Sequence, residues 1–494
     1  MKKYRYISLL LTLFFALVSP LSFGQKLDCR QKKTLKNLKK DIAYLASDEL
    51  MGRATGTEGE RKSAEFIARS FQANGLTPKG EQGYFQKFKI TTLRIADKKT
   101  KFNLNGKDLA LYGEFYPLSY SSNSGSASSG IVDAGYGIVN DTRNDYKDID
   151  AKGKVVFINL GSPDGIHPHS KFLAWHGISI RVDEAIKHGA KGVVFYRSSE
   201  NVERPSGDLS LTMKPSQIPV LYLDHVRNDI SNLAFASIDM RIMVDEDTGY
   251  NVIGFKDNGA KTTVVIGAHH DHLGQGQHGN SLADNPNEIH NGADDNASGT
   301  AALSALAKQL KKAKKWNKQN NYLFIAFSGE EMGLLGSKYF VNNPTVDLTA
   351  VNYMMNMDMI GMLNPEKVLI INGVGTSPAF YKSITSLNTT MEGIGSVTIR
   401  TSGIGPSDHT SFYFKGIPAI HYFTGAHDHY HKPTDDVDNL NYVGEVFVIQ
   451  HMLDLIAMLN DRGKIEFTKT KDNSESKNGK SRMKLEVTLG VVPN

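Results

Sequence analysis

The chain has 494 residues, of which 40% are hydrophobic and 22% charged, a composition typical of a globular protein with two or three domains. Its formal net charge of +5 is small for this length and the lysines are spread along the chain, which argues against nucleic acid as the natural partner. A single cysteine, Cys29, excludes an intramolecular disulfide framework.

Residues 1–24 are predicted to be a secretory signal peptide. They combine a basic start, an apolar segment too short to span a membrane comfortably and a small-residue cleavage site before Gln25. A short membrane anchor is the alternative interpretation. We therefore expect a secreted or periplasmic protein with no membrane span in the remaining chain.

The first part of the mature chain, 25–110, is predicted to begin a domain that is completed later in the sequence. Its clearest helix follows Thr57, which has the spacing of a capping box with Glu60 and precedes apolar residues at helical intervals. Between 111 and 245 the sequence changes to short strands and glycine-rich turns. We interpret 111–245 as a β-rich domain inserted into the first one.

From 246 to 463, predicted strands alternate with predicted helices. This alternation is typical of an α/β fold with a mostly parallel central sheet flanked by helices. Residues 464–494 are predicted to be a polar linker that ends in one strand without a partner.

Histidine, aspartate and glutamate residues follow the ends of several of these strands, where open α/β sheets bind their ligands. Converging carboxylates would repel each other and take up protons unless cations were present, so bound metal is the simplest explanation. Histidines and carboxylates without sulfur suit zinc, with manganese or cobalt left open. More donors are present than one tetrahedral ion needs, which indicates two ions. Each motif alone is a weak signal, and the prediction depends on their joint occurrence.

Five motifs together resemble a known family: GAHHDH, NGADDNASG, SGEEMGLLGS, MNMDMIG and YHKPTDD. They resemble the zinc-dependent aminopeptidases with co-catalytic metals, whose relatives include glutamate carboxypeptidase and glutaminyl cyclase. The resemblance covers about 25–110 and 246–463 and implies a fold of the zinc exopeptidase type. Residues 111–245 resemble a protease-associated domain, a common insertion in that family. The C-terminal residues LEVTLGVVPN resemble the opening of a PDZ-like domain.

The resemblance also implies a set of metal ligands. His269 and Asp358 would hold one ion, and Glu331 and His431 the other. Asp295 would bridge the two ions, and the peptide bond that follows it would be cis. Together they would form a site for two divalent ions, with zinc favoured.

Further roles follow from the same resemblance. Glu330 would be the general base, and Asp271 would orient the imidazole of the ligand histidine before it. Tyr430 would donate a hydrogen bond to the developing oxyanion, with packing at the loop mouth as the alternative. Asp408 would be a partner of the catalytic glutamate. The other histidines near the motifs are interpreted as solvated loop or core residues: His272, His278, His290, His421, His427 and His429.

The predicted function is a secreted metallo-aminopeptidase that hydrolyses N-terminal peptide bonds of peptides or proteins. The alternatives are a glutaminyl cyclase, a carboxypeptidase on the same fold, or a non-catalytic binding protein. All five ligand positions and the base are present, which favours an enzyme. No arginine cluster can be placed at a substrate carboxylate, which ranks a carboxypeptidase below an aminopeptidase. Side-chain specificity and oligomeric state are left open.

Overall fold

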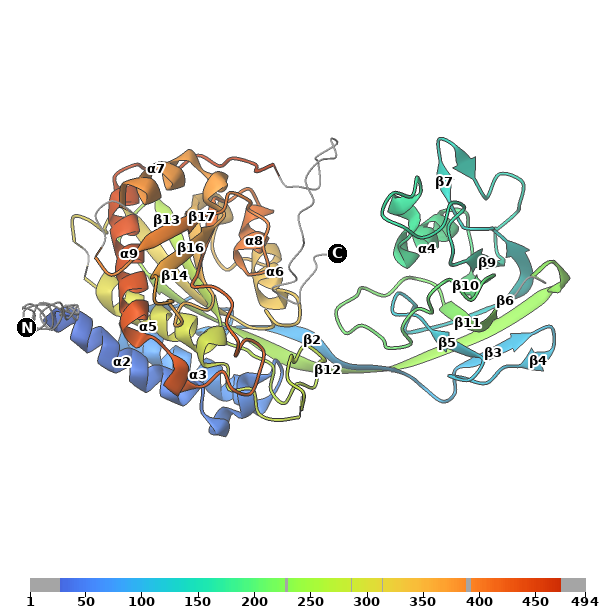
Figure 1. Ribbon diagram of the computed structural model, residues 1–494, viewed down its shortest axis with the longest axis horizontal. Helices are drawn as coiled ribbons and strands as arrows, with labels where there is room; N and C mark the ends of the chain where they lie inside the picture. Colours follow the sequence, from blue (N-terminus) through green and yellow to red (C-terminus); the bar gives the residue numbers. More distant parts are fainter. Residues whose placement is uncertain (1–26, 227–229, 286, 313, 388–391, 472–494) are drawn as a thin grey trace, which may run out of the picture. The chain divides into compact units, whose positions relative to one another are not determined.

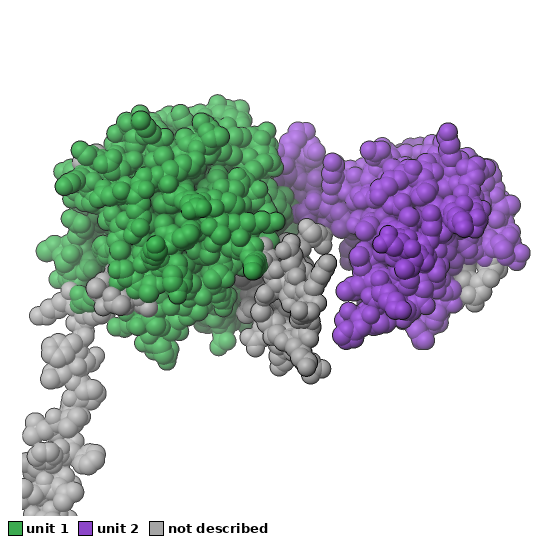
Figure 2. Space-filling view, turned by 90° about the horizontal axis from the view of Figure 1, so that it is seen from above, with its two compact units in different colours: residues 1–88, 249–494 green, residues 89–248 purple. Residues whose placement is uncertain are grey.

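The computed structural model describes residues 27–226, 230–285, 287–312, 314–387 and 392–471. The predicted signal peptide and the predicted C-terminal strand lie outside these residues. The chain divides into two compact units, shown in green and purple in Figure 2. Unit 1 comprises 1–88 and 249–494, and unit 2 comprises 89–248.

Unit 1 is built on one mostly parallel sheet (Figure 1). In spatial order the strands are β17 (Ser396–Ile399), β16 (Val368–Asn372), β18 (Ala419–Phe423), β15 (Val351–Met357), β13 (Thr262–His269), β14 (Asn320–Phe327) and β12 (Phe235–Lys256). The central strands pair in parallel, whereas β12 pairs antiparallel with β14 and with β1 (Thr77–Pro78), and β16 pairs antiparallel with β18. The predicted fold class is therefore confirmed.

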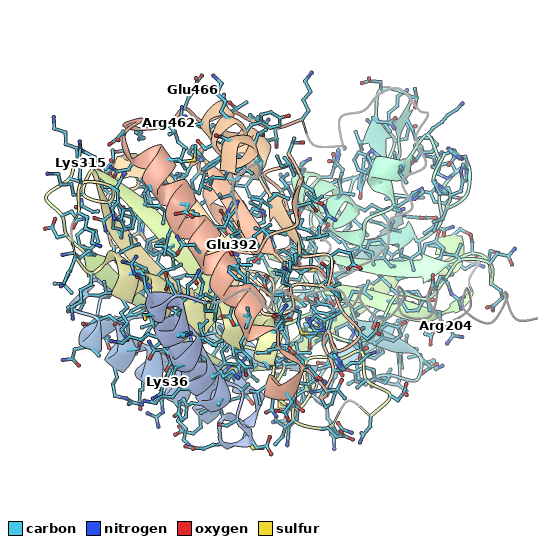
Figure 3. All side chains as sticks on the ribbon, turned by 60° about the vertical axis from the view of Figure 1, so that its left-hand side comes forward. Lys36, Arg204, Lys315, Glu392, Arg462 and Glu466 are labelled. Carbon is cyan, nitrogen blue, oxygen red and sulfur yellow. The ribbon has the colours of Figure 1, made fainter. Side chains whose placement is uncertain are left out.

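Helices cover both faces of this sheet, because alternate side chains of its strands point to opposite faces and both sets are apolar. One face packs against helices α2 (Cys29–Leu45), α3 (Glu58–Ala73), α5 (Gly299–Leu310), α7 (Pro378–Leu387) and α9 (Tyr442–Asn460). The other face packs against α6 (Leu335–Asn342) and α8 (His409–Tyr413). Charged side chains such as Lys36 and Lys315 lie at the surface of these layers (Figure 3).

Helix α9 is the one helix among the described residues that is long and apolar enough to cross a membrane. Its most apolar window is 67% buried inside the protein, and Val448, Met452 and Leu455 are inaccessible to solvent. The apolar character of α9 is thus explained by packing in the core of unit 1.

Unit 2 has a β-rich core of its own. A parallel series of β6 (Ser124–Asp133), β9 (Val155–Asn159), β10 (Gly192–Arg197) and β11 (Val220–Val226) ends in the antiparallel strand β5 (Phe115–Pro117). Helix α4 (Ile178–Lys187) packs on one face of these strands. The other face contacts β3 (Lys101–Leu104) and the first half of β12.

The start of the insertion differs from the predicted boundary at 111. Unit 2 begins at Lys89, within strand β2 (Phe85–Ala96). Residues 101–104 belong to unit 2 because they pair antiparallel with 236–239 of β12, and β4 (Lys107–Asp108) pairs in turn with β3. The partners are far apart in sequence, so the pattern of the early segment alone does not reveal this pairing.

Candidate metal centre

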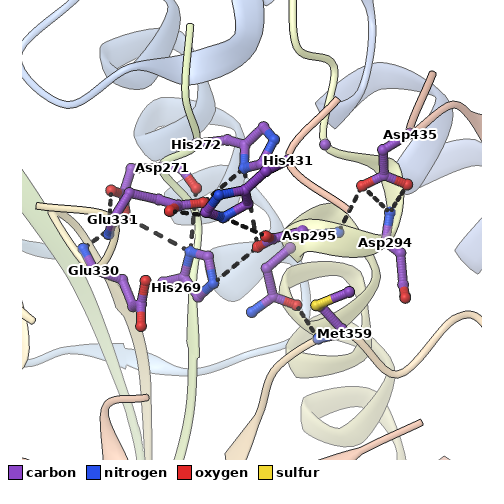
Figure 4. A network of polar contacts seen from close by, with 12 residues as sticks. His269, Asp271, His272, Asp294, Asp295, Glu330, Glu331, Met359, His431 and Asp435 are labelled. Carbon is purple, nitrogen blue, oxygen red and sulfur yellow. Dashed lines mark hydrogen bonds and ion pairs between the residues drawn. The ribbon is translucent and has the colours of Figure 1, made fainter. Parts of the chain in front are cut away.

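The central strands of unit 1 deliver the predicted metal ligands to one end of the sheet. His269 is the last residue of β13, and Asp358 directly follows β15. Glu331 lies four residues beyond the end of β14, and Asp295 lies in the turn Ala293–Ser298 that leads into α5. His431 lies in the loop after β18. The five side chains come together, and four of them are at least 90% buried. Figure 4 labels His269, Asp295, Glu331 and His431 of this set.

Asp295 stands between two groups of donors. Its Oδ1 lies 3.3 Å from Nε2 of His269, and the same nitrogen lies 3.3 Å from Oδ1 of Asp358. Its Oδ2 lies 3.4 Å from Nε2 of His431, which in turn lies 3.2 Å from Oε2 of Glu331. The two oxygens of Asp295 therefore face different groups, which is the arrangement required of a bridging carboxylate. The peptide bond between Asp295 and Asn296 is cis, as predicted.

These spacings fit divalent metal ions. Zinc bonds to nitrogen and oxygen are about 2.0–2.1 Å long, which places neighbouring donors of a tetrahedral site about 3.3–3.4 Å apart. The four distances around Asp295 range from 3.2 to 3.4 Å. All the donors are nitrogen or carboxylate oxygen, a set that suits zinc. The residues present therefore fit two ions that share Asp295.

The charges of the cluster also favour the binding of cations. Burial would raise the pKa of Glu331, but His431 and the hydrogen bonds from the neighbouring histidines lower it to about 2. Burial would lower the pKa of His431, but Glu331 and Asp295 raise it to about 11. The carboxylates thus attract positive charge strongly. Because a histidine must be neutral to bind a metal, ion binding here would release protons.

Glu330 differs from its neighbour Glu331. Its side chain is 5% exposed, and its pKa lies well above the usual value because of burial and of the charges of Asp358, Glu331 and Asp408. No hydrogen bond to its carboxylate is formed within the described cluster of Figure 4. A carboxylate of this kind has a high affinity for protons and is not committed to another partner, as a general base requires.

The carboxylate of Asp271 fixes the backbone that carries both glutamates. It accepts hydrogen bonds from Oγ1 of Thr55 at 2.9 Å and from the N–H groups of Glu330 at 3.2 Å and Glu331 at 3.4 Å. Its own distance to Nδ1 of His269 is 3.7 Å, whereas that nitrogen lies 3.1 Å from the backbone carbonyl of Asp271. The main chain of Asp271 therefore orients the imidazole of His269, and the side chain orients the two glutamates.

Tyr430 lies against the second donor group. Its ring stacks on the imidazole of His431 with centroids 3.9 Å apart, and it packs with Met359 and Phe423. Burial, followed by the charges of Asp295 and Glu331, raises the pKa of its hydroxyl. Tyr430 therefore remains a neutral hydrogen-bond donor beside the cluster. Packing and donation, the two roles considered from sequence, are both compatible with this position.

Two positioning residues were not identified from sequence. Asp435 accepts hydrogen bonds from the N–H groups of Asp294 and Asp295, although its place in YHKPTDD offered a signal. The fully buried guanidinium of Arg53 donates to the backbone carbonyls of Leu45, His270, Asn291 and Gly292. Burial lowers the pKa of Arg53 to about 10, so it remains a cation beside an acidic cluster.

The other histidines separate into two groups. His272 joins the cluster, with Nδ1 2.8 Å from Oε1 of Glu331. Three of the others contact residues outside the predicted ligand set: Nε2 of His427 lies 3.1 Å from Asp294, Nε2 of His290 lies 2.8 Å from Ser281, and Nδ1 of His421 lies 3.1 Å from Asn372. Asp408 is buried, which raises its pKa to about 7, and its charge contributes to the raised pKa of Glu330.

The segment that contains the candidate centre is similar to known proteins. The model of Peptidase family M28 matches residues 251–459, which include the whole candidate centre. Aminopeptidase YwaD of Bacillus subtilis (strain 168) is 26% identical over 419 residues, covering 80% of this chain and 78% of that protein. Leucine aminopeptidase 2 of Trichophyton rubrum is 25% identical over 458 residues, covering 85% and 83%.

A solved structure shares the fold. The aminopeptidase from Aneurinibacillus sp. strain AM-1 aligns with a TM-score of 0.51 and 22% sequence identity, covering 89% of this chain and 96% of that one. This likeness concerns the fold. The family match covers the segment that contains all five motifs. Residues 251–459 of this chain therefore match peptidase family M28.

Proposed function

We propose that this protein is a metallo-aminopeptidase that hydrolyses the N-terminal peptide bond of peptides or proteins with two divalent metal ions, zinc being favoured. The observation that supports this most strongly is the position of Asp295, whose two oxygens face two separate histidine–carboxylate groups. The relatives YwaD and leucine aminopeptidase 2 bear the same activity in their names.

The proposed ligands form the same two groups as the short distances around Asp295 define. His269 and Asp358 would hold one ion, Glu331 and His431 the other, and Asp295 both. When bound, such ions act as Lewis acids that polarise the scissile carbonyl and make water a better nucleophile. The chain fixes its ligands beforehand, since Nδ1 of His269 is held by the carbonyl of Asp271 at 3.1 Å and Nδ1 of His431 by that of Asn280 at 2.9 Å.

Glu330 carries out the proton transfer. Its carboxylate takes a proton from the attacking water and returns it to the nitrogen of the leaving amine. Burial and the carboxylates around it raise its pKa, which strengthens it as a base. The carboxylate of Asp271 keeps Glu330 in place by accepting a hydrogen bond from the main-chain N–H of Glu330. Tyr430 donates a hydrogen bond to the oxyanion that develops at the carbonyl.

The alternatives have less support. A glutaminyl cyclase would use one zinc ion, whereas the donors here form two groups. A non-catalytic binding protein has no need of a buried, unpaired Glu330 beside intact ligands. A carboxypeptidase would need a cationic group for the substrate carboxylate, and Arg53, the cation buried beside the cluster, is already bound to four carbonyls.

Two further parts of the proposal concern the rest of the chain. The basic and apolar character of residues 1–24 supports secretion or periplasmic location. The β-rich core of unit 2 and its insertion within the sequence of unit 1 support its interpretation as a protease-associated domain.

The test combines metal analysis with a panel of aminoacyl, N-blocked and glutaminyl peptides. We expect two ions per chain and cleavage only of substrates with a free amine. Cleavage of N-blocked peptides with a free carboxylate would establish a carboxypeptidase instead. One ion per chain with cyclisation of glutaminyl peptides would establish a cyclase, and two ions without turnover of any substrate would leave a binding protein.

A further inference from the structure

His272 is the histidine of the cluster to which neither the resemblance nor the proposed mechanism gives a role. Its side chain is 1% exposed, and its ring packs directly on the main chain of Gly292, where a Cβ atom would lie 2.4 Å from Cδ2 of His272. Its own N–H donates to the carbonyl of Arg53 at 3.1 Å. The ring is therefore held in one place, with Nδ1 directed at Glu331 (Figure 4).

The distances distinguish a hydrogen bond from metal ligation. Nδ1 of His272 lies 2.8 Å from Oε1 of Glu331 and 3.9 Å from Oδ1 of Asp295. The first distance is shorter than the roughly 3.3 Å expected between two donors of one tetrahedral zinc ion, and the second is longer. A separation of 2.8 Å is instead typical of an N–H group that donates to a charged carboxylate.

This contact divides the carboxylate of Glu331 between two histidines. Oε1 accepts from His272, whereas Oε2 lies 3.2 Å from Nε2 of His431, at the spacing of a shared metal ion. The ionised carboxylate is only an acceptor, so Nδ1 of His272 carries the proton. Glu331 is thereby left with one oxygen for an ion.

The rest of Glu331 is held as well. Its N–H donates to Asp271 at 3.4 Å, and its carbonyl accepts from Nδ2 of Asn280 at 3.4 Å. These two contacts fix the main chain, and His272 is the donor that selects the orientation of the carboxylate. Among the described residues, the side chain that contacts the carboxylate of Asp358 is His269 itself. The His269–Asp358 group therefore has no separate donor that corresponds to His272.

We propose that His272 is a positioning residue for the second metal ion: it donates a hydrogen bond from Nδ1 to Oε1 of Glu331 and so presents Oε2 to the ion shared with His431. This inference rests on the proposed two-metal function. Its consequence is selective, because loss of His272 affects the Glu331–His431 site before the His269–Asp358 site.

Two variants separate the hydrogen bond from the bulk of the ring. His272→Leu removes the donor and keeps an apolar group of similar size in the buried site. His272→Asn keeps a donor, because the amide nitrogen of asparagine lies at about the same distance along the side chain as Nδ1. His429→Leu is the matched control, since this histidine lies two residues before His431 and its ring contacts Thr434 rather than the cluster.

The experiment titrates Zn²⁺ into the metal-free full chain and follows binding by calorimetry and by metal content after dialysis. We expect two binding steps in the wild type and in the control. In His272→Leu one step should weaken about tenfold to a hundredfold, as found when partners of metal ligands are removed. The other step should be almost unchanged, and His272→Asn should recover most of the loss. Circular dichroism and a urea titration check that each variant is folded.

The outcomes against the proposal are distinct. Unchanged binding of both ions by His272→Leu would show that His272 does not position Glu331. An equal and complete loss of one ion in the Leu and Asn variants would show that His272 is itself a ligand. A wild-type chain that bound fewer than two ions would contradict the proposed function itself, which the variants do not test.

Discussion

The carboxylate of Asp435 accepts a hydrogen bond at 3.0 Å from the main-chain N–H of Asp295, a residue 140 positions earlier in the chain. It also accepts from the N–H of Asp294 at 3.0 and 3.1 Å. The turn that presents the proposed bridging ligand is therefore held by the loop that carries His431. This one carboxylate therefore aligns two distant segments that carry proposed ligands.

Replacing Asp435 by asparagine should loosen this turn. The asparagine side chain has one oxygen acceptor, and its amide group would face N–H donors, so about 1–3 kcal/mol of stability should be lost. Urea unfolding of the metal-free chain measures this loss, and zinc titration should show weaker binding. Asp436→Asn is the control, because Asp436 accepts from the side chain of Asn291 outside this turn. Equal effects of the two substitutions would contradict the role of Asp435.

Substitutions of the two adjacent glutamates should have different effects on activity and metal binding. Glu330→Gln removes the proton acceptor but leaves every proposed ligand, so kcat should fall about a hundredfold to ten-thousandfold while both ions remain bound. Glu331→Ala should lose one ion. Metal content and steady-state kinetics on an aminoacyl substrate measure both effects. Near-normal kcat in Glu330→Gln would show that the base has been assigned to the wrong residue.

Arg53→Lys should be strongly destabilising although the charge is kept. The planar guanidinium serves four carbonyls from different segments, and an ammonium group concentrates its donors at one point. Two or more buried carbonyls would lose their donors, at a cost of at least about 2 kcal/mol in the free energy of unfolding. Arg61→Lys is the control, because the exposed ion pairs of Arg61 with Glu58 and Glu65 contribute little. Similar urea midpoints for both variants would contradict this prediction.

Glu445, in the first turn of α9, should make stability depend on pH. It is fully buried, neither of its oxygens has a hydrogen-bond partner in the described part of the chain, and burial and the charge of Asp294 raise its pKa well above 4.5. The unfolded chain releases this proton near pH 4.5, but the folded chain retains it. The folded state therefore binds more protons, and the free energy of unfolding falls as pH rises.

Glu445→Gln should remove this dependence. Its stability relative to the wild type should increase from pH 5 upwards by up to about 1.4 kcal/mol per pH unit. Urea unfolding at pH 5, 6.5 and 8 measures the difference. The exposed Glu466 is the control, and Glu466→Gln should follow the wild type at each pH. Parallel curves for Glu445→Gln and the wild type would mean that Glu445 is not protonated in the folded chain.

The sequence was sufficient where structure is determined by residues that are close together along the chain. Alternating strands and helices in 246–463 predicted the mostly parallel sheet, and the strand ends placed His269, Glu330 and Asp358 at one edge because parallel strands share a direction. The family resemblance predicted the cis bond after Asp295, which the structure confirms. The catalytic and metal-binding roles of these residues stay predictions, although the structure brings the residues together.

Contacts between distant segments could not be predicted in this way. Thr57 caps α3 as expected by accepting from the N–H of Glu60 at 3.4 Å. The carboxylate of Glu60 does not complete the capping box, however, because it accepts from the N–H groups of Gly56 and Tyr250 and from Oγ of Ser328. His272 was likewise interpreted as a solvated loop or core residue, because its distance to Glu331 depends on how β13 and β14 pair.

The pairing of β1 with β12 has a consequence for how the chain folds. Thr77 and Pro78 pair with Phe255 and Gly254, which lie beyond the whole of unit 2, and a Cβ atom on Gly249 would lie 2.7 Å from the ring of Phe88. The chain thus leaves unit 1 and returns to it at one place. While 89–248 is unfolded, joining these strands means closing a very long loop. Once that segment has folded, its ends already meet, which lowers the entropic cost of closure by about 3 kcal/mol on the logarithmic dependence on loop length. The folded insertion then joins the two parts of unit 1 with the entropic cost of a short loop.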